Sequence, residues 1–366
     1  MLLDLLRGEA PEPQGPAVVS EVIARAEVHG VLEAIAQPLL DLADLPDRDR
    51  AAVSESRLVT VARHLYLASQ VGSLRGALDG SGVPLAVFKG PVLAMEAYGD
   101  PARRRYGDID VLVAGRDFGK ALDALSDAGG TLIDTNWAHQ LSGSRAEASI
   151  LMPQGLHVDL HWHLCNERTF RADTSLPIED MLARRRWLSL ASGVEVPVLD
   201  RFDTFLSTAL HAAMNGAYRL LWLKDVERLA AGSSGDEWQE LVLRCREGRV
   251  AVAVGLVLGR SRRLLRAPVP QAVTEDLLSG HPWSSVLRQW ESAAGPEAVV
   301  YQKGTRRATI SAARDGLWAT GRAAASEAMR KAKGVAGSAA DNPLRAGGED
   351  ATARLAYLTA VTTGRI

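Results

Sequence analysis

The chain has 366 residues, of which 47% are hydrophobic and 23% charged, and its formal net charge is −2. This length exceeds what one small core organises and suits two or three modules. The near-neutral charge balance provides no global positive field of the kind that favours nucleic acid, and the two cysteines form no CxxC pair that would indicate a zinc knuckle. The sequence shows neither a signal-peptide pattern nor an apolar run long enough to span a bilayer, so we expect a cytoplasmic protein with no membrane partner.

Helical patterns come first along the chain. Residues 18–42 read as a helix interrupted by Pro38, and residues 49–78 read as a long apolar-periodic helix that Gly80 closes. We therefore assign residues 1–80 to an N-terminal helical region.

Short strands and helices alternate in the next segment. The expected strands are 84–88, 108–113, 131–134, 148–152 and 156–164, and the expected helices are 91–98 and 116–128. This order predicts an α/β (α+β) fold, with a small mixed-sheet core over residues 81–200.

Helical periodicity returns after residue 200. The expected helices are 201–214, 217–231, 236–247 and 250–265, which predict a C-terminal helical domain over residues 201–300. Residues 301–366 read as a basic helix reaching residue 333, followed by a mobile tail. A solvated helix is the favoured interpretation of these basic residues; nucleic acid, an acidic partner or a membrane surface are the alternatives.

Two aspartates begin the strand with sequence DIDVLV. Asp108 and Asp110 are separated by one residue, so on a strand they point to the same face. Two carboxylates on one face repel each other unless a cation lies between them, and Mg²⁺ prefers oxygen ligands and bridges carboxylates to phosphates. The pair predicts a metal site, the alternative being two solvated aspartates at a strand start.

A third acid lies in the segment HVDLHWHL. Asp159 shares a strand face with His157, His161 and His163, and if this strand lies beside DIDVLV, the three aspartates can hold two Mg²⁺ ions. A zinc or iron site made by these four side chains is disfavoured, because consecutive residues on one face of a strand are too far apart to converge on one ion.

The phosphate half of the site is expected at the strand-to-helix turn Lys89-Gly90. The glycine lets the backbone approach a ligand closely, and Lys89 adds a positive charge. Three arginines precede the aspartates, and we expect Arg104 and Arg105 to contact the nucleotide. An ordinary turn and a solvated basic loop are the alternatives.

The runs FKGPVLAMEAYGDPARRRYGDIDVLV and HVDLHWHL together resemble the largely uncharacterised bacterial nucleotidyltransferase family of the polymerase-beta-like superfamily. The resemblance covers about residues 83–164 and continues weakly through LHAAMN and LLWLKD. Pro91 stands where the superfamily commonly has serine, which removes a hydroxyl contact to phosphate.

By this resemblance, Asp108, Asp110 and Asp159 are the catalytic and metal-binding acids. Lys89, Gly90 and Arg104 are the nucleotide-binding residues by the same resemblance, and His211 and Asp225 lie where the family has a recurring His and Asp. The sequence pattern adds Arg105, from the basic loop, as a nucleotide-binding residue and His161 as a further candidate for the cleft. The implied reaction transfers NMP, with ATP the favoured donor, to a hydroxyl or phosphate of a small-molecule, peptide or protein acceptor. Family members occur beside lasso-peptide biosynthesis genes, which makes peptide tailoring one role to consider.

Two other functions remain open. The chain could be an antitoxin-like or regulatory binding protein that keeps a nucleotidyltransferase fold. It could also be a glycosyltransferase that uses Asp108-Ile109-Asp110 to bind a nucleotide sugar through a metal, although this reading gives Asp159 and Lys89 no task.

Overall fold

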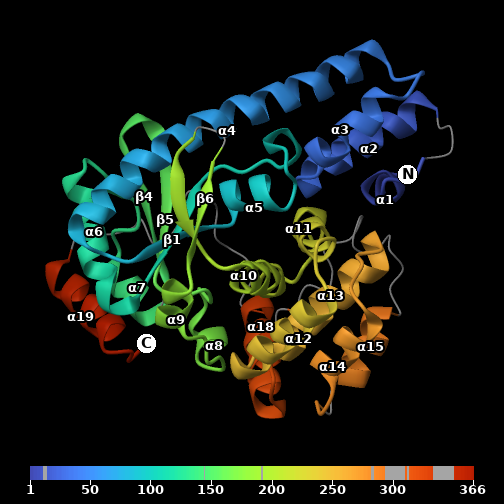
Figure 1. The fold of residues 1–366 in the computed structure, drawn as a ribbon. Coiled ribbons are helices and arrows are strands. Elements are labelled where there is room, and N and C mark those ends of the chain that lie inside the picture. Colours follow the sequence, from blue (N-terminus) through green and yellow to red (C-terminus); the bar gives the residue numbers. More distant parts are fainter. Residues whose placement is uncertain are drawn as a thin grey trace.

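The structure, a computed structural model, contains a seven-stranded mixed sheet, which lies in the left half of the molecule in Figure 1. The spatial order of its strands is β3-β4-β5-β2-β1-β7-β6. The strands are β1 (Leu85–Phe88), β2 (Ile109–Val113), β3 (Thr131–Leu132), β4 (Glu147–Leu151), β5 (His157–His161), β6 (Arg186–Ser189) and β7 (Glu195–Val198). The structure describes residues 1–10, 15–143, 145–190, 193–281, 284–292, 310, 313–332 and 350–366.

Helices surround the sheet and build the rest of the molecule. Those of the first half are α1 (Leu2–Arg7), α2 (Pro16–His29), α3 (Leu32–Leu40), α4 (Asp47–Ser81), α5 (Gly90–Glu96), α6 (Phe118–Asp127), α7 (Trp137–Gly143), α8 (Arg168–Arg171) and α9 (Ile178–Ala183). Those of the second half are α10 (Arg201–Met214), α11 (Leu220–Ala230), α12 (Gly235–Glu247), α13 (Ala251–Leu265), α14 (Gln271–Leu278), α15 (Ser284–Ser292), α18 (Leu317–Ala332) and α19 (Ala351–Thr362). The expected mixed α/β fold, with helices before and after the sheet, is confirmed.

The two faces of the sheet pack into different hydrophobic cores. On β2, Ile109 and Val111 join a core made with α4, α6 and α19, whereas Leu112 joins the core of the N-terminal and C-terminal helices. Because side chains alternate along a strand, Asp110 lies on the face of Leu112. The acidic face of the sheet is therefore turned toward the helical half of the molecule.

The 35-residue helix α4 connects the two cores. It runs along the whole upper side of the molecule in Figure 1, from the N-terminal helices to the sheet. Val53, in its first half, belongs to the core of the helical half, and Leu67 to Leu78 contribute to the core under the sheet. This helix fixes the N-terminal helices relative to the strands.

The helix boundaries differ from the expectation at two points. Pro38 lies inside α3 without interrupting it, and the break falls instead at Gly30, which adopts a left-handed conformation with φ of 69° after α2. Gly80 lies inside α4, which ends at Gly82 with φ of 68°. In both cases a glycine at positive φ ends the helix, because its missing Cβ permits that conformation.

Several elements were not expected from the sequence, among them β6, β7 and α19. Strands β6 and β7 extend the sheet beyond β1 as a hairpin, and β7 pairs with β1 in parallel. Helix α19 lies in the segment that we expected to be a mobile tail, yet its Tyr357 is fully buried and it packs on α6 and α7. Of the expected basic helix, residues 317–332 form α18, whereas residues 313–316 are described and are not helical. Residues 301–309, 311–312 and 333–349 lie outside the described part of the chain. None of the helices in the described ranges has the length and apolar character to cross a membrane.

Candidate active site

A cleft of about 890 Å³ opens between the acidic face of the sheet and the helical half. Its sheet side carries the aspartates, and its other walls come from α2, α4, the segment before β2, and the connection between α10 and α11. Nine residues that we predicted for the site line it: Lys89, Gly90, Arg104, Arg105, Asp108, Asp110, Asp159, His161 and His211. Residues far apart in the sequence thus meet in one cavity of a size that suits small-molecule ligands.

The two aspartates inside strands are direct neighbours. Strands β2 and β5 run parallel, and Asp110 pairs with Asp159 in the register of the two strands. Their side chains therefore project from the same face of the sheet, next to each other. Asp108 lies one residue before β2 and borders the same cleft. The expected adjacency of the DIDVLV and HVDLHWHL strands is confirmed.

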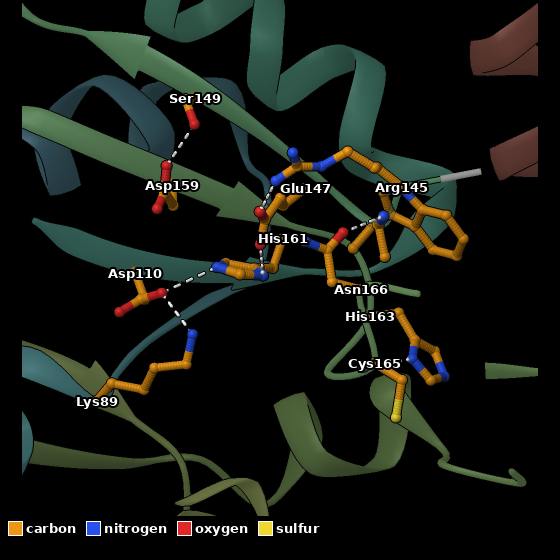
Figure 2. A network of polar contacts seen from close by, with 12 residues as sticks. Lys89, Asp110, Arg145, Glu147, Ser149, Asp159, His161, His163, Cys165 and Asn166 are labelled. Atoms are coloured by element: carbon orange, nitrogen blue, oxygen red, sulfur yellow. Dashed lines mark hydrogen bonds and ion pairs between the residues drawn. The ribbon is translucent and has the colours of Figure 1, made fainter. Parts of the chain in front are cut away.

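Asp110 is held between two cationic or polar neighbours. Its Oδ1 lies 2.6 Å from Nζ of Lys89 and 2.9 Å from Nε2 of His161. Figure 2 shows Asp110 in contact with both side chains. Burial alone would raise the pKa of this carboxyl, but the Lys89 ammonium and the His161 contact lower it well below its usual range. Asp110 is therefore ionised at neutral pH although only 5% of its surface is exposed.

The carboxyl pKa values of Asp108 and Asp159 are shifted in the opposite direction to that of Asp110. Burial, and next the negative charge of Asp110, raise the pKa of Asp108. Burial raises the pKa of Asp159 to about 6, opposed by a 2.7 Å hydrogen bond donated by the Ser149 hydroxyl. Close carboxylates that disfavour one another's charge are what a divalent cation stabilises.

A fourth carboxylate, Glu147, was missed by sequence reasoning. It begins β4 directly opposite His161, forms an ion pair with Arg145, and its Oε2 lies 3.4 Å from Nδ1 of His161, longer than a good hydrogen bond. Figure 2 shows His161 reaching between Asp110 and Glu147. The alternation of the EASIL segment could have placed Glu147 on a strand face, but not beside His161, because that depends on how β4 pairs with β5.

The Lys89-Gly90 turn is tightly constrained. Lys89 has φ of 55°, a left-handed value that a non-glycine residue adopts only at some energetic cost. A Cβ on Gly90 would lie 3.0 Å from the Tyr106 ring and 3.1 Å from the carbonyl oxygen of Asp108. A side chain at this position would therefore force the Tyr106 ring or the strand start that carries Asp108 to move by a few tenths of an ångström.

The two expected nucleotide-binding arginines are already paired with acids. Arg104 forms two 2.8 Å contacts with the carboxylate of Asp225, and its Nη1 lies 3.3 Å from the carbonyl oxygen of Gly90. Arg105 forms an ion pair with Glu33 at 2.7 Å. Arg104 thus stabilises the Lys89-Gly90 turn through its contact with the Gly90 carbonyl oxygen. Its partner Asp225 is buried and, contrary to the expectation, does not line the cleft.

The carboxylates fit a divalent cation by their chemistry, but they are not gathered around one point. Within the described residues, no three side chains of His, Cys, Asp or Glu are arranged as a ready metal site. The four side chains of the zinc alternative also diverge: His157 is exposed, and Nδ1 of His163 accepts a hydrogen bond from the backbone of Cys165. An oxygen-rich site for Mg²⁺ is the better fit.

Comparison with known proteins now adds to this geometry. The model of a family described as uncharacterised nucleotidyltransferase matches residues 16–266. The chain belongs to this family. The match spans the sheet, the whole cleft and helices α2 to α13, and it ends before α14, α15, α18 and α19. No curated protein matches the chain significantly.

Family membership supports an enzyme, a transferase of nucleotidyl groups, and with it an NTP as substrate. The aspartates, the constrained Lys89-Gly90 turn and the cleft all lie inside the matched region.

Proposed function

We propose that the protein catalyses Mg²⁺-dependent transfer of NMP from an NTP, with ATP favoured, to a hydroxyl or phosphate of an acceptor. The observation that carries this proposal is the register of β2 and β5, which brings Asp110 and Asp159 side by side in the cleft with Asp108 next to them. The acceptor is a small molecule, a peptide or a protein, and tailoring of a peptide natural product is one such use.

Each residue has a task in this reaction. Asp108, Asp110 and Asp159 would hold the metal, and Lys89 supplies a positive charge for phosphate oxygens. Mg²⁺, when bound, neutralises the phosphates and the leaving pyrophosphate and lowers the pKa of the attacking hydroxyl. The chain itself keeps Asp110 ionised, fixes the turn at Gly90 and places the reactants in one cleft, so positioning and charge supply most of the rate enhancement.

The direct test uses ATP labelled on its α-phosphate. The purified protein, Mg²⁺ and a fractionated metabolite and peptide extract should give a labelled product together with pyrophosphate. Asp110→Asn should reduce transfer by about 100-fold or more, because removing a charge that stabilises the transition state has effects of that order. Asp79→Asn, at an exposed position on α4, is the matched control and should transfer normally. Equal transfer by Asp110→Asn and the wild type would refute the proposed site.

The binding-protein alternative makes a different prediction in the same assay. A protein that only binds a partner would release no pyrophosphate with any fraction, and Asp110→Asn would leave partner binding unchanged. A glycosyltransferase would instead be stabilised against heat by UDP-sugars and not by ATP.

A further inference from the structure

The wall of the cleft formed by α10 and α11 has a composition unlike that of the sheet side. Two aromatic rings, those of His211 and Trp222, line the cleft here, and the Tyr218 ring packs against Trp222 without lining it. We call these three rings the aromatic wall. The His211 and Tyr218 rings both meet Trp222 edge-on, with centroid distances of 5.5 Å and 5.2 Å. Arg219 is exposed, and its guanidinium lies 5.9 Å from the centroid of the Trp222 ring.

The aromatic wall begins next to the predicted phosphate site. The charges of Lys89 and Asp110 both act on the His211 ring, whose pKa is lowered to about 3 mainly by burial. His211 is therefore neutral at physiological pH and offers a π surface without a charge. Trp222 and Arg219 line the same cleft as Lys89 and His211, and Arg219 is exposed. A ligand with its phosphates at Lys89 can therefore place its remaining part beside these rings.

The turn that precedes Arg219 and α11 is held by hydrogen bonds from other parts of the chain. Ala217 has φ of 46°, and the Arg260 guanidinium donates hydrogen bonds to the carbonyl oxygens of Gly216 and Ala217 at 2.8 Å and 2.9 Å. The backbone N–H of Leu220 donates to the ring of His29 at 3.3 Å. A strained turn held by buried contacts is typical of a backbone that serves a ligand.

Arg219 also differs from the other arginines of the cleft in its partners. Arg104 and Arg105 are neutralised by Asp225 and Glu33. Arg63 donates instead to the backbone carbonyl oxygens of Tyr106 and Gly107. Across the part of the chain that the structure describes, no carboxylate forms an ion pair with Arg219. Its donors are available to acceptor atoms of a ligand that lies on Trp222.

We propose that Trp222 and Arg219 form the binding site for the purine base of the nucleotide, with the base stacked on Trp222 and a guanidinium N–H donated to N7. This inference rests on the proposed function and names the part of the NTP that the wall recognises. Bases stack on aromatic side chains and on arginine, and N7 is an acceptor that adenine and guanine share and that arginine commonly binds. The wall therefore selects purine over pyrimidine nucleotides.

Calorimetric binding of two ligands tests the stacking. MgATP and Mg-tripolyphosphate share the phosphate chain, and only ATP carries a base. Trp222→Ala should weaken ATP binding by about fivefold or more, as expected for one lost stacking contact, and leave tripolyphosphate binding unchanged. Trp222→Phe retains a ring and should restore most of the ATP affinity. Trp318→Ala, at a position 85% exposed and outside the cleft, is the control for tryptophan removal.

A second comparison tests Arg219. The wild type should bind ATP more tightly than 7-deaza-ATP, which lacks the N7 acceptor, and Arg219→Gln should remove this preference. Since Arg219 is exposed at the start of α11, this variant is expected to fold, and its melting temperature checks that.

The outcomes separate the two proposals. Equal loss of ATP and tripolyphosphate affinity in Trp222→Ala would overturn the base site. Unchanged ATP affinity in this variant would also overturn it, and would indicate that the aromatic wall contacts the acceptor and not the nucleotide. Tighter binding of CTP than of ATP by the wild type would overturn the purine assignment. If the wild type bound neither ATP nor tripolyphosphate, the proposed function itself would fail.

Discussion

Two ion pairs contact the Lys89-Gly90 turn and differ in their geometry and in how they border the cleft. Arg104 and Asp225 meet through two contacts of 2.8 Å, with 7% and 2% of their side chains exposed, and the Tyr98 hydroxyl donates to the same carboxylate at 2.9 Å. Lys89 and Asp110 meet through one oxygen at 2.6 Å, and both border the open cleft.

The difference separates a structural role from a functional one. We call the Arg104–Asp225 pair sealed, because Asp225 is buried and lies outside the cleft lining, although Arg104 borders the cleft. Its planar geometry suits a permanent contact between the strand side of the cleft and α11. The Lys89–Asp110 pair faces the cavity, where phosphate oxygens could take over the contact with Lys89 and a cation the contact with Asp110. The Lys89-Gly90 turn is thus held by Arg104, whose ion pair is permanent, while the Lys89–Asp110 contact can be exchanged for contacts with a ligand.

The largest expected effect on stability comes from the sealed pair. Arg104→Leu should lower the free energy of unfolding by about 3–5 kcal/mol, because it leaves the buried Asp225 carboxylate without its cation. Lys89→Met should lower it by only about 1 kcal/mol, since His161 and water in the cleft still reach Asp110. Urea unfolding of both variants measures the contrast. Similar losses in the two variants would remove the distinction between the pairs.

Loss of a buried hydrogen bond between uncharged groups should lower the free energy of unfolding by less than loss of the sealed ion pair. The hydroxyl of Tyr357, on α19, accepts a hydrogen bond from Trp162 at 2.9 Å and donates one to the carbonyl oxygen of Arg145 at 2.7 Å. Tyr357→Phe leaves both groups buried without this partner and should cost about 1–3 kcal/mol. The same unfolding experiment measures it, and an unchanged midpoint would mean that α19 does not support the ends of β4 and β5.

The smallest expected effect is the pH dependence of stability and metal affinity that results from the titration of Asp159. Asp159 has its pKa raised to about 6, above its value in an unfolded chain, so the folded protein retains a proton there between about pH 4 and pH 6. Stability contributed by this group falls as the pH rises through that window, whereas metal affinity rises, because only the carboxylate binds a cation. Metal affinity should therefore drop about tenfold per pH unit below pH 6. Asp159→Asn should flatten this profile, and an equally steep profile in the variant would assign the titration to another group.

The sequence allowed the strands that carry the aspartates to be predicted because their signals are local. Alternation in DIDVLV and HVDLHW fixes which side chains share a face, and the fully buried Val158 and Leu160 agree with it. Helix ends were less accurate, because Pro38 is tolerated near the end of α3 while Gly30 adopts the left-handed conformation that ends α2.

Contacts between distant segments could not be predicted in the same way. Glu147 enters the site through the pairing of β4 with β5, and Arg104 is sealed by Asp225, 121 residues later in the chain. A run of three arginines predicts positive charge beside the cleft, but the sequence does not show which of these arginines forms an ion pair with an acid from a distant segment. Helix α19 follows a segment of linker-like composition, and its burial depends on Tyr357 reaching Trp162, a contact that no local pattern reveals.

Mn²⁺ binding in the presence of ATP, followed by electron paramagnetic resonance, is the measurement that shows whether Asp110 and Asp159 bind the same divalent cation. Asp110→Asn and Asp159→Asn should each weaken Mn²⁺ binding by at least about tenfold, while Asp79→Asn should bind as the wild type does. Wild-type Mn²⁺ affinity in Asp159→Asn, with the protein folded, would contradict a shared site.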